Sequence, residues 1–359
     1  MNGLVRKCML SFVLGVFALS GVFADAIGSG QPAAFISLYG EKTAIGMTEL
    51  NQKVASYKAA ASQNGGDASQ FTQGNVLDIM INDQLVLIAA KHEGLEVTDS
   101  LKDNLYTSQF SSAVQQYKQQ SGVTLTQEAF DKQVVSAYGS VDNFKTTLAQ
   151  QYLLGQYLKK KQPDLMDSNV TVSDDDIKSF YRSNATQFVN PECAKVAQIF
   201  IPFDKDDSTQ DADNKALMEK LHGEIESGDI TFEKAVAQYS KDEGSVNNGG
   251  EIGWVTMDDT QNIKKLLGDT FFNACMETDV GKISDVITST SGYHIIKVLS
   301  HVQAKFLKID DPINPDSKTT VRDYISNYLK QQQAQKNYQL AINNVVTDLR
   351  KQATITKLV

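Results

Sequence analysis

The stretch NGGEIGW, residues 248–254, is a glycine-dense turn that feeds a strand. Farther along the chain, SGYHIIKV at residues 291–298 has the pattern of an apolar strand that carries a histidine on one face. Two segments precede these runs: VAQIFI at residues 196–201 and FEKAVAQYSKD at residues 232–242. Together the four segments make residues 190–302 the most informative part of the sequence.

In that order and spacing, the four segments resemble the parvulin family of peptidyl-prolyl isomerases. Two of them alone would be weak evidence, whereas all four together are a specific signal. The resemblance implies a parvulin-like domain at residues 186–303, with a four-stranded antiparallel sheet and flanking helices. It also implies catalysis of cis/trans isomerisation at X-Pro bonds, without a cofactor.

Isomerisation of an X-Pro bond needs neither a nucleophile nor a metal. Rotation has a barrier of about 18–20 kcal/mol, because the planar amide must lose its resonance. A catalyst needs an apolar slot for the proline ring and polar groups that favour the twisted amide over the planar one. Mapped through the parvulin resemblance, the residues that would line this slot are Ile252, Leu267, Phe271 and Met276.

The polar candidates follow from the same resemblance. Asp242 falls where the family places a cysteine or aspartate beside the substrate carbonyl, and His294 falls at the family's second histidine. Ser291 is the hydroxyl neighbour of that histidine on the strand. Three glycines would let the backbone turn with positive φ and pass close to the ligand: Gly249, Gly250 and Gly253.

Each candidate also has an ordinary structural interpretation. Leu267 and Phe271 have helical spacing and could be plain core residues. Asp242, within the run KDEG, could be a solvated loop carboxylate. A histidine on an apolar strand, such as His294, is often a hydrogen-bonded core residue. The sequence leaves these alternatives open.

Gln198 departs from the family pattern, which usually has a first histidine in this strand. A glutamine amide donates and accepts hydrogen bonds but does not become charged near neutral pH. We therefore expect an incomplete histidine network and reduced or absent isomerase activity. The alternative to a catalytic foldase is a non-catalytic holdase that uses the parvulin fold as a peptide-binding module.

Five aspartates gather in the segment 204–213. They would repel a dianionic phosphate, so we do not expect recognition of phosphopeptides. A calcium-binding EF-hand loop would need a central glycine and a glutamate at its twelfth position, and the segment has neither in place. Since the histidines also lack metal-ligand spacing, we predict no metal site.

The first residues have the composition of a signal peptide. Arg6 and Lys7 precede an apolar run at residues 9–19, and small residues around Ala24 suit a signal peptidase. The run is shorter than the roughly 20 residues of a membrane span, which argues against a retained anchor. We expect cleavage after Ala24, hence a periplasmic protein without an integral membrane span. Cys8 lies before the apolar run and cannot be a lipid-modified cysteine.

The chain as a whole is acidic and moderately apolar. Its 359 residues are 21% charged and 41% hydrophobic, typical of a soluble globular protein of more than one domain. Loss of two basic and no acidic residues with residues 1–24 changes the net charge from −9 to −11. Nucleic acid is therefore an unexpected partner. Cys193 and Cys275 would remain. The sequence allows a disulfide bridge between these two cysteines but does not require one.

Helical periodicity outside the parvulin-like segment predicts two further regions. Residues 33–162 have the pattern of amphipathic helices, with Thr48 as one N-cap, and Ser173 begins a capping signal. A long C-terminal helix carries an apolar stripe and needs a partner, for which we predict the N-terminal helices. The predicted domains are a signal peptide at 1–24, an N-terminal helical chaperone region at 25–185, the parvulin-like domain at 186–303 and the C-terminal helix at 304–359.

This arrangement is similar to periplasmic foldases of the SurA and PrsA kind. The similarity covers residues 46–50, 81–94 and 172–188, although only the parvulin part has specific motifs, present in one copy. It implies an α+β multidomain protein in which a helical chaperone module carries an inserted parvulin domain. It also implies unfolded or nascent exported polypeptides and proline-containing peptides as clients, and a role in outer-membrane protein assembly if the source has two membranes.

Overall fold

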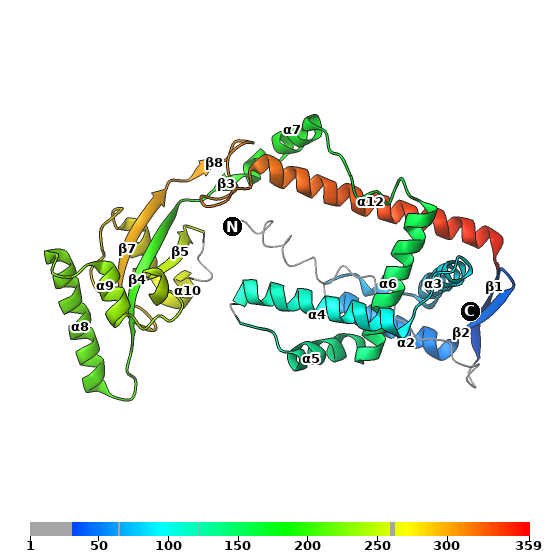
Figure 1. Ribbon diagram of the computed structural model, residues 1–359, viewed down its shortest axis with the longest axis horizontal. Coiled ribbons are helices and arrows are strands. Elements are labelled where there is room, and N and C mark those ends of the chain that lie inside the picture. Colours follow the sequence, from blue (N-terminus) through cyan, green and yellow to red (C-terminus); the bar gives the residue numbers. More distant parts are fainter. Residues whose placement is uncertain (1–30, 64, 122, 259–262) are drawn as a thin grey trace. The chain divides into compact units, whose positions relative to one another are not determined.

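The computed structural model describes residues 31–63, 65–121, 123–258 and 263–359, whose elements are labelled in Figure 1. The predicted signal peptide, residues 1–24, lies outside the described residues. The described chain divides into two compact units: residues 172–329, and residues 31–171 together with 330–359.

The first unit contains a four-stranded antiparallel sheet made of β4 (Cys193–Pro202), β5 (Glu251–Thr256), β6 (Ile287–Thr288) and β7 (Gly292–Val302). The strand order is β5-β4-β7-β6. The central pair, β4 and β7, places Gln198 opposite Ile296 and Phe200 opposite His294. This sheet confirms the predicted α+β architecture of the parvulin-like domain.

Helices cover both faces of the sheet: α8 (Ser208–Ser227) and α9 (Phe232–Tyr239) lie on one face, and α10 (Ile263–Leu267) and α11 (Asp269–Glu277) on the other. Successive residues of a strand point to opposite faces. Ile199 of β4 accordingly packs with α8 and α9, whereas Val196 packs with α11. Both side chains are fully buried, so the sheet has an apolar core on each side.

The segments before and after the four-stranded sheet add a few short elements to this unit. Helix α7 (Asp174–Ser183) begins at the predicted cap, since the Ser173 side chain accepts a hydrogen bond from the backbone N–H of Asp176. A two-stranded antiparallel ribbon joins these elements to the four-stranded sheet. The remaining elements are the short 3-10 helix η2 (Ala185–Gln187), the ribbon strands β3 (Val189–Asn190) and β8 (Lys305–Phe306), and the start of α12 (Val321–Gln352).

Trp254, the single tryptophan of the sequence, ties the edge strand β5 to the segment before α12. Its indole Nε1–H donates a hydrogen bond to Asp316 Oδ2 at 2.6 Å. Lys195 Nζ lies 2.9 Å from a carboxylate oxygen of Glu251 and 3.5 Å from Asp316 Oδ2. The fluorescence of this one tryptophan is therefore a local reporter of folding in the parvulin-like sheet.

The second unit contains a three-stranded sheet that the helical pattern did not predict. Its strands are β1 (Pro32–Leu38), β2 (Glu41–Gly46) and β9 (Thr354–Lys357), in the order β2-β1-β9. The prediction that residues 33–162 are helical throughout is therefore wrong for its first part. Ala34, Ile36 and Leu38 alternate into the core, which is a strand period, and the β1 and β2 pairing makes a hairpin turn at Tyr39 and Gly40.

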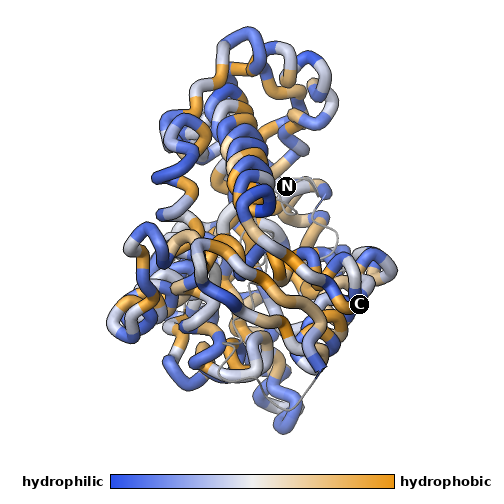
Figure 2. The backbone as a smooth tube through the Cα atoms, turned by 90° about the vertical axis from the view of Figure 1, so that its right-hand side faces the viewer, coloured by the Kyte–Doolittle hydropathy of each residue, from blue (hydrophilic) through white to orange (hydrophobic). Residues whose placement is uncertain are grey.

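Helices complete the second unit: α2 (Met47–Gln63), the short η1 (Ala68–Gln70), α3 (Gln73–His92), α4 (Asp99–Ser121), α5 (Gln127–Tyr138) and α6 (Val141–Lys161). Thr48 lies inside α2 instead of capping it, because the helix continues directly from β2. Hydrophobic positions recur between hydrophilic ones along the helical parts of the tube (Figure 2).

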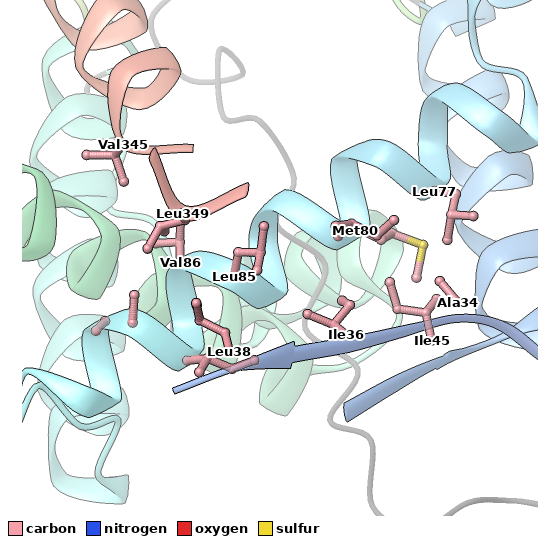
Figure 3. Close-up of a cluster of buried hydrophobic side chains, with 14 of the residues drawn as sticks. Ala34, Ile36, Leu38, Ile45, Leu77, Met80, Leu85, Val86, Val345 and Leu349 are labelled. Atoms are coloured by element: carbon pink, nitrogen blue, oxygen red, sulfur yellow. The ribbon is translucent and has the colours of Figure 1, made fainter. Parts of the chain in front are cut away.

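The last part of α12 packs into the core of this unit. Ala341, Val345 and Leu349 follow each other at intervals of four residues and join a cluster with β1 and α3 (Figure 3). Arg350 adds polar contacts to α3: its Nη2 lies 2.6 Å from Asp78 Oδ1 and its Nε 2.7 Å from Asn82 Oδ1. Both ends of the described chain thus contribute to one hydrophobic core. None of the described helices has the length and apolarity to cross a bilayer.

Candidate functional site

The polar candidates meet on one face of the central strand pair. His294 lies on β7 and Gln198 on β4, and both side chains point to the face covered by α11. Asp242 follows the end of α9 and reaches the same place from the side. The sheet register brings together two residues 96 positions apart in sequence.

A continuous chain of hydrogen bonds links these residues. Gln198 Nε2 donates to Asp242 Oδ2 at 2.8 Å, and Gln198 Oε1 lies 2.9 Å from His294 Nδ1. On the other side of the imidazole, Nε2 lies 2.8 Å from Ser289 Oγ. Asp242 Oδ2 also accepts a hydrogen bond from Ser245 Oγ at 2.5 Å. The paired-histidine network still lacks its first histidine, but the Gln198 amide spans the gap between Asp242 and His294.

The predicted hydroxyl, Ser291, is not the one beside the histidine. Ser289 Oγ contacts His294 Nε2, whereas Ser291 contributes its backbone N–H to Ser289 Oγ at 3.0 Å and has an exposed side chain. The run TSTS at residues 288–291 offers four hydroxyls in succession. Only the bend between β6 and β7 determines which of them faces the ring, so composition alone could not have selected Ser289.

Ser245 was also missed by the sequence reasoning. It is 2% exposed, and its hydroxyl and backbone both bind the turn that carries Asp242. Its backbone N–H donates to the Asp242 carbonyl at 3.1 Å, and its own carbonyl accepts from Gly250 N at 2.9 Å. Ser245 thus joins the Asp242 turn to the glycine turn that starts β5.

Burial sets the protonation states at this site. It lowers the pKa of His294 to about 4, although the nearby charge of Asp242 opposes the shift. Burial also opposes ionisation of Asp242, but the hydrogen bonds from Ser245, Gln198 and the Gly244 backbone outweigh it, so that the pKa of Asp242 lies below its usual value. At neutral pH the site therefore holds an ionised carboxylate and a neutral imidazole.

The predicted slot residues lie in one apolar cluster beside the network. Phe271 packs edge-on against the His294 ring with 4.9 Å between centroids, and Phe200 lies 4.7 Å away at an interplanar angle of 30°. Phe271 is fully buried and Met276 nearly so, while Ile252 and Leu267 are half-buried against the same cluster. In this conformation Phe271 is a core residue, and a proline ring could contact it only after its neighbours move.

The acidic segment 204–213 has a local structural role. Asp207 caps α8 by accepting from the backbone N–H groups of Thr209 and Gln210, and Asp204 accepts from those of Asp206 and Asp207.

Within the described part of the chain, no group of three or more histidine, cysteine or acidic side chains could hold a metal ion. Cys193 and Cys275 are both buried and unbridged.

Known proteins that are similar to this chain include an isomerase domain family and bacterial foldases. Residues 179–302 match the family model described as PPIC-type PPIASE domain. The foldase protein PrsA of Clostridium botulinum (strain 657 / Type Ba4) is 24% identical over 278 residues, which cover 77% of this chain and 72% of the relative. PrsA 3 of Bacillus cereus is 32% identical over 220 residues, covering 60% of this chain and 64% of the relative.

Two further matches have the SurA name. The chaperone SurA of Alcanivorax borkumensis is 32% identical over 127 residues, which cover 35% of this chain and 25% of that protein. A solved structure of SurA-like chaperones from Campylobacter jejuni has a TM-score of 0.32 and 20% identity, covering 72% of this chain and 94% of that one. Residues 179–302 are therefore a domain of the PPIC-type peptidyl-prolyl isomerase family. The chain that carries it is similar to the foldase PrsA and, over a shorter stretch, to the chaperone SurA.

Proposed function

We propose that this protein is an exported folding factor that binds unfolded polypeptides and catalyses cis/trans isomerisation of X-Pro bonds. The observation that carries the proposal is the unbroken network from Asp242 through Gln198 and His294 to Ser289, placed against Phe271. The domain match at residues 179–302 and the foldase and chaperone relatives support the assignment. The proposed clients are nascent or unfolded exported chains in the periplasm, including outer-membrane proteins, and the proposed export signal is residues 1–24.

The chemistry requires little of the protein beyond a dry, polarised surface. A planar X-Pro amide carries more charge separation than the twisted one, so an apolar environment disfavours the planar ground state. Fixed dipoles that match the twisted amide then lower the barrier, because they need no reorganisation during rotation. The proposed roles are an apolar contact for the proline ring at the half-buried Ile252 and Leu267, which extends to Phe271 and Met276 once their neighbours move, and an oriented polar edge made by the hydrogen-bonded network.

A protease-coupled assay with proline-containing peptides tests catalysis by the full chain. We expect measurable turnover that falls about tenfold or more in His294→Gln, since one lost transition-state interaction of about 1.4 kcal/mol is tenfold in rate. We expect Gln198→His to raise kcat/KM, because it restores the histidine of ordinary parvulins. An exposed change on the same domain, Asp279→Asn, serves as the control and should leave turnover unchanged. Absence of turnover in the wild-type chain would reject the catalytic role.

The alternative function, a non-catalytic holdase, is favoured by the complete burial of Phe271. It predicts that the chain suppresses aggregation of an unfolded membrane β-barrel protein when the two are diluted together, as measured by light scattering. We expect at least a twofold reduction at equimolar chain, unchanged in His294→Gln. Suppression without isomerase turnover would establish the holdase, and absence of both would leave the protein without a folding role.

A further inference from the structure

The direction of every hydrogen bond in the Asp242–His294 network follows from one charge. Asp242 is ionised at neutral pH, because its carboxylate accepts three hydrogen bonds that hold its pKa below the usual value. An ionised carboxylate only accepts hydrogen bonds. Both partners of Asp242 Oδ2 must therefore donate: the hydroxyl of Ser245 at 2.5 Å and the amide Nε2 of Gln198 at 2.8 Å.

This requirement orients the Gln198 amide. With its NH₂ group turned to Asp242, the amide presents Oε1 to His294 Nδ1 at 2.9 Å. The reverse orientation would place Oε1 against a carboxylate oxygen, which is a repulsive contact between two acceptors at 8% exposure of the Gln198 side chain. Because Oε1 can only accept, Nδ1 of His294 must carry a hydrogen.

The other imidazole nitrogen is then determined as well. Burial keeps His294 neutral near pH 7, so it carries one hydrogen, on Nδ1, and Nε2 is an acceptor. Its partner, Ser289 Oγ, receives the backbone N–H groups of Ser291 at 3.0 Å and Gly292 at 3.3 Å. Since Nε2 accepts, the Ser289 hydrogen points to it at 2.8 Å and not to the Ser291 hydroxyl, whose Oγ lies 3.2 Å from Ser289 Oγ.

We propose that Gln198, oriented by Asp242, is a positioning residue that holds His294 in the neutral tautomer with its hydrogen on Nδ1. An imidazole in the place of Gln198 could carry its hydrogen on either nitrogen and pass it along, whereas an amide cannot. The network is therefore a row of fixed dipoles that starts at one carboxylate, with the Ser289 hydroxyl directed to the histidine and not to a substrate. The proposal depends on the proposed function only where it gives this row a part in isomerisation.

Nitrogen NMR of the full chain, labelled with ¹⁵N-histidine, tests the tautomer directly. The sequence has only four histidines, and His294→Gln assigns the signal. At pH 7 we expect His294 to show a protonated Nδ1 and an unprotonated Nε2. In Asp242→Asn the new amide at position 242 can donate as well as accept, so it no longer fixes the orientation of the Gln198 amide. Gln198 can then donate to Nδ1, and a substantial fraction of the Nε2–H tautomer of His294 should appear. Gln198→Met, which removes the acceptor for Nδ1–H, should have the same effect.

Asp279→Asn, an exposed carboxylate-to-amide change in the same domain, is the matched control and should leave the His294 signal unchanged. An Nε2–H tautomer or a doubly protonated ring in the wild-type chain overturns the proposal, even if neither variant folds. A wild-type Nδ1–H signal that persists in a folded variant also overturns it, because Asp242 and Gln198 would then not control the tautomer. Since this readout needs no substrate, its outcome is independent of whether the chain turns over peptides.

Discussion

The variant Gly250→Ala is expected to unfold about 10 °C below the wild-type chain in the transition that Trp254 fluorescence reports. A Cβ at this position would lie 2.5 Å from the carbonyl oxygen of Gln198 and 3.0 Å from Val236 Cγ2, with a backbone φ of +82°. The carbonyl cannot retreat, since it belongs to the central strand β4. Strain of about 3 kcal/mol corresponds to about 6–12 °C for a unit of this size.

A second alanine isolates the effect of that contact. Gly223 lies within α8, and a Cβ there would meet nothing within 4 Å. Gly223→Ala should therefore stabilise the domain by about 0.5–1 kcal/mol, because alanine has the better helix propensity. Fluorescence-detected melting of both variants is the measurement. Equal melting temperatures for Gly250→Ala and the wild type would show that β4 and the glycine turn do not approach as closely as described.

The variant Leu349→Ala is expected to lower the free energy of unfolding of the second unit by about 3 kcal/mol, within the range for large-to-small changes in a core. Leu349 is 3% exposed and packs with β1 and α3 although it is near the end of the chain. Removing three of its carbons leaves a void that the strands and helices around it cannot fill. Circular dichroism of the thermal transition, which follows the helices, measures the loss.

Leu340→Ala on the same helix is the control. Leu340 is 49% exposed, so its truncation should change the stability by less than about 0.5 kcal/mol. A similar small effect for Leu349→Ala would contradict the packing of α12 against the N-terminal strands and helices. A large effect for both would indicate that Leu340 is also packed in solution, because alanine is the better helix former and helix propensity cannot account for a loss of stability.

Local patterns predicted much of the parvulin-like domain correctly. The apolar strands at residues 196–201 and 291–298 and the glycine turn at 248–254 signal their structure over a few residues. The cap at Ser173 is equally local, because a hydroxyl and an N–H three residues apart make it. Such features depend on residues that are close in sequence, so the amino-acid sequence of the segment is sufficient to predict them.

The sheet β2-β1-β9 shows where local patterns fail. β1 pairs with β9 from Ala34↔Lys357 to Ser37↔Thr354, so its partner comes from the other end of the chain. Neither segment has a turn signal that connects it to the other. The sequence predicted that the C-terminal helix needs a partner. It did not predict the short strand after that helix, because the hydrogen bonds of β9 are made with β1 and depend on the packing of the two distant segments.

The candidate site divides in the same way. The sequence, through its resemblance to parvulins, predicted Asp242, Gln198 and His294 as site residues, and it alone showed that a glutamine stands where a histidine is expected. Only the tertiary structure decided that the glutamine amide joins Asp242 to His294, and that Ser289 and not Ser291 faces the ring. The physical reason is register: a shift of one residue in a strand or bend turns a side chain to the opposite face, and contacts between distant strands determine that register.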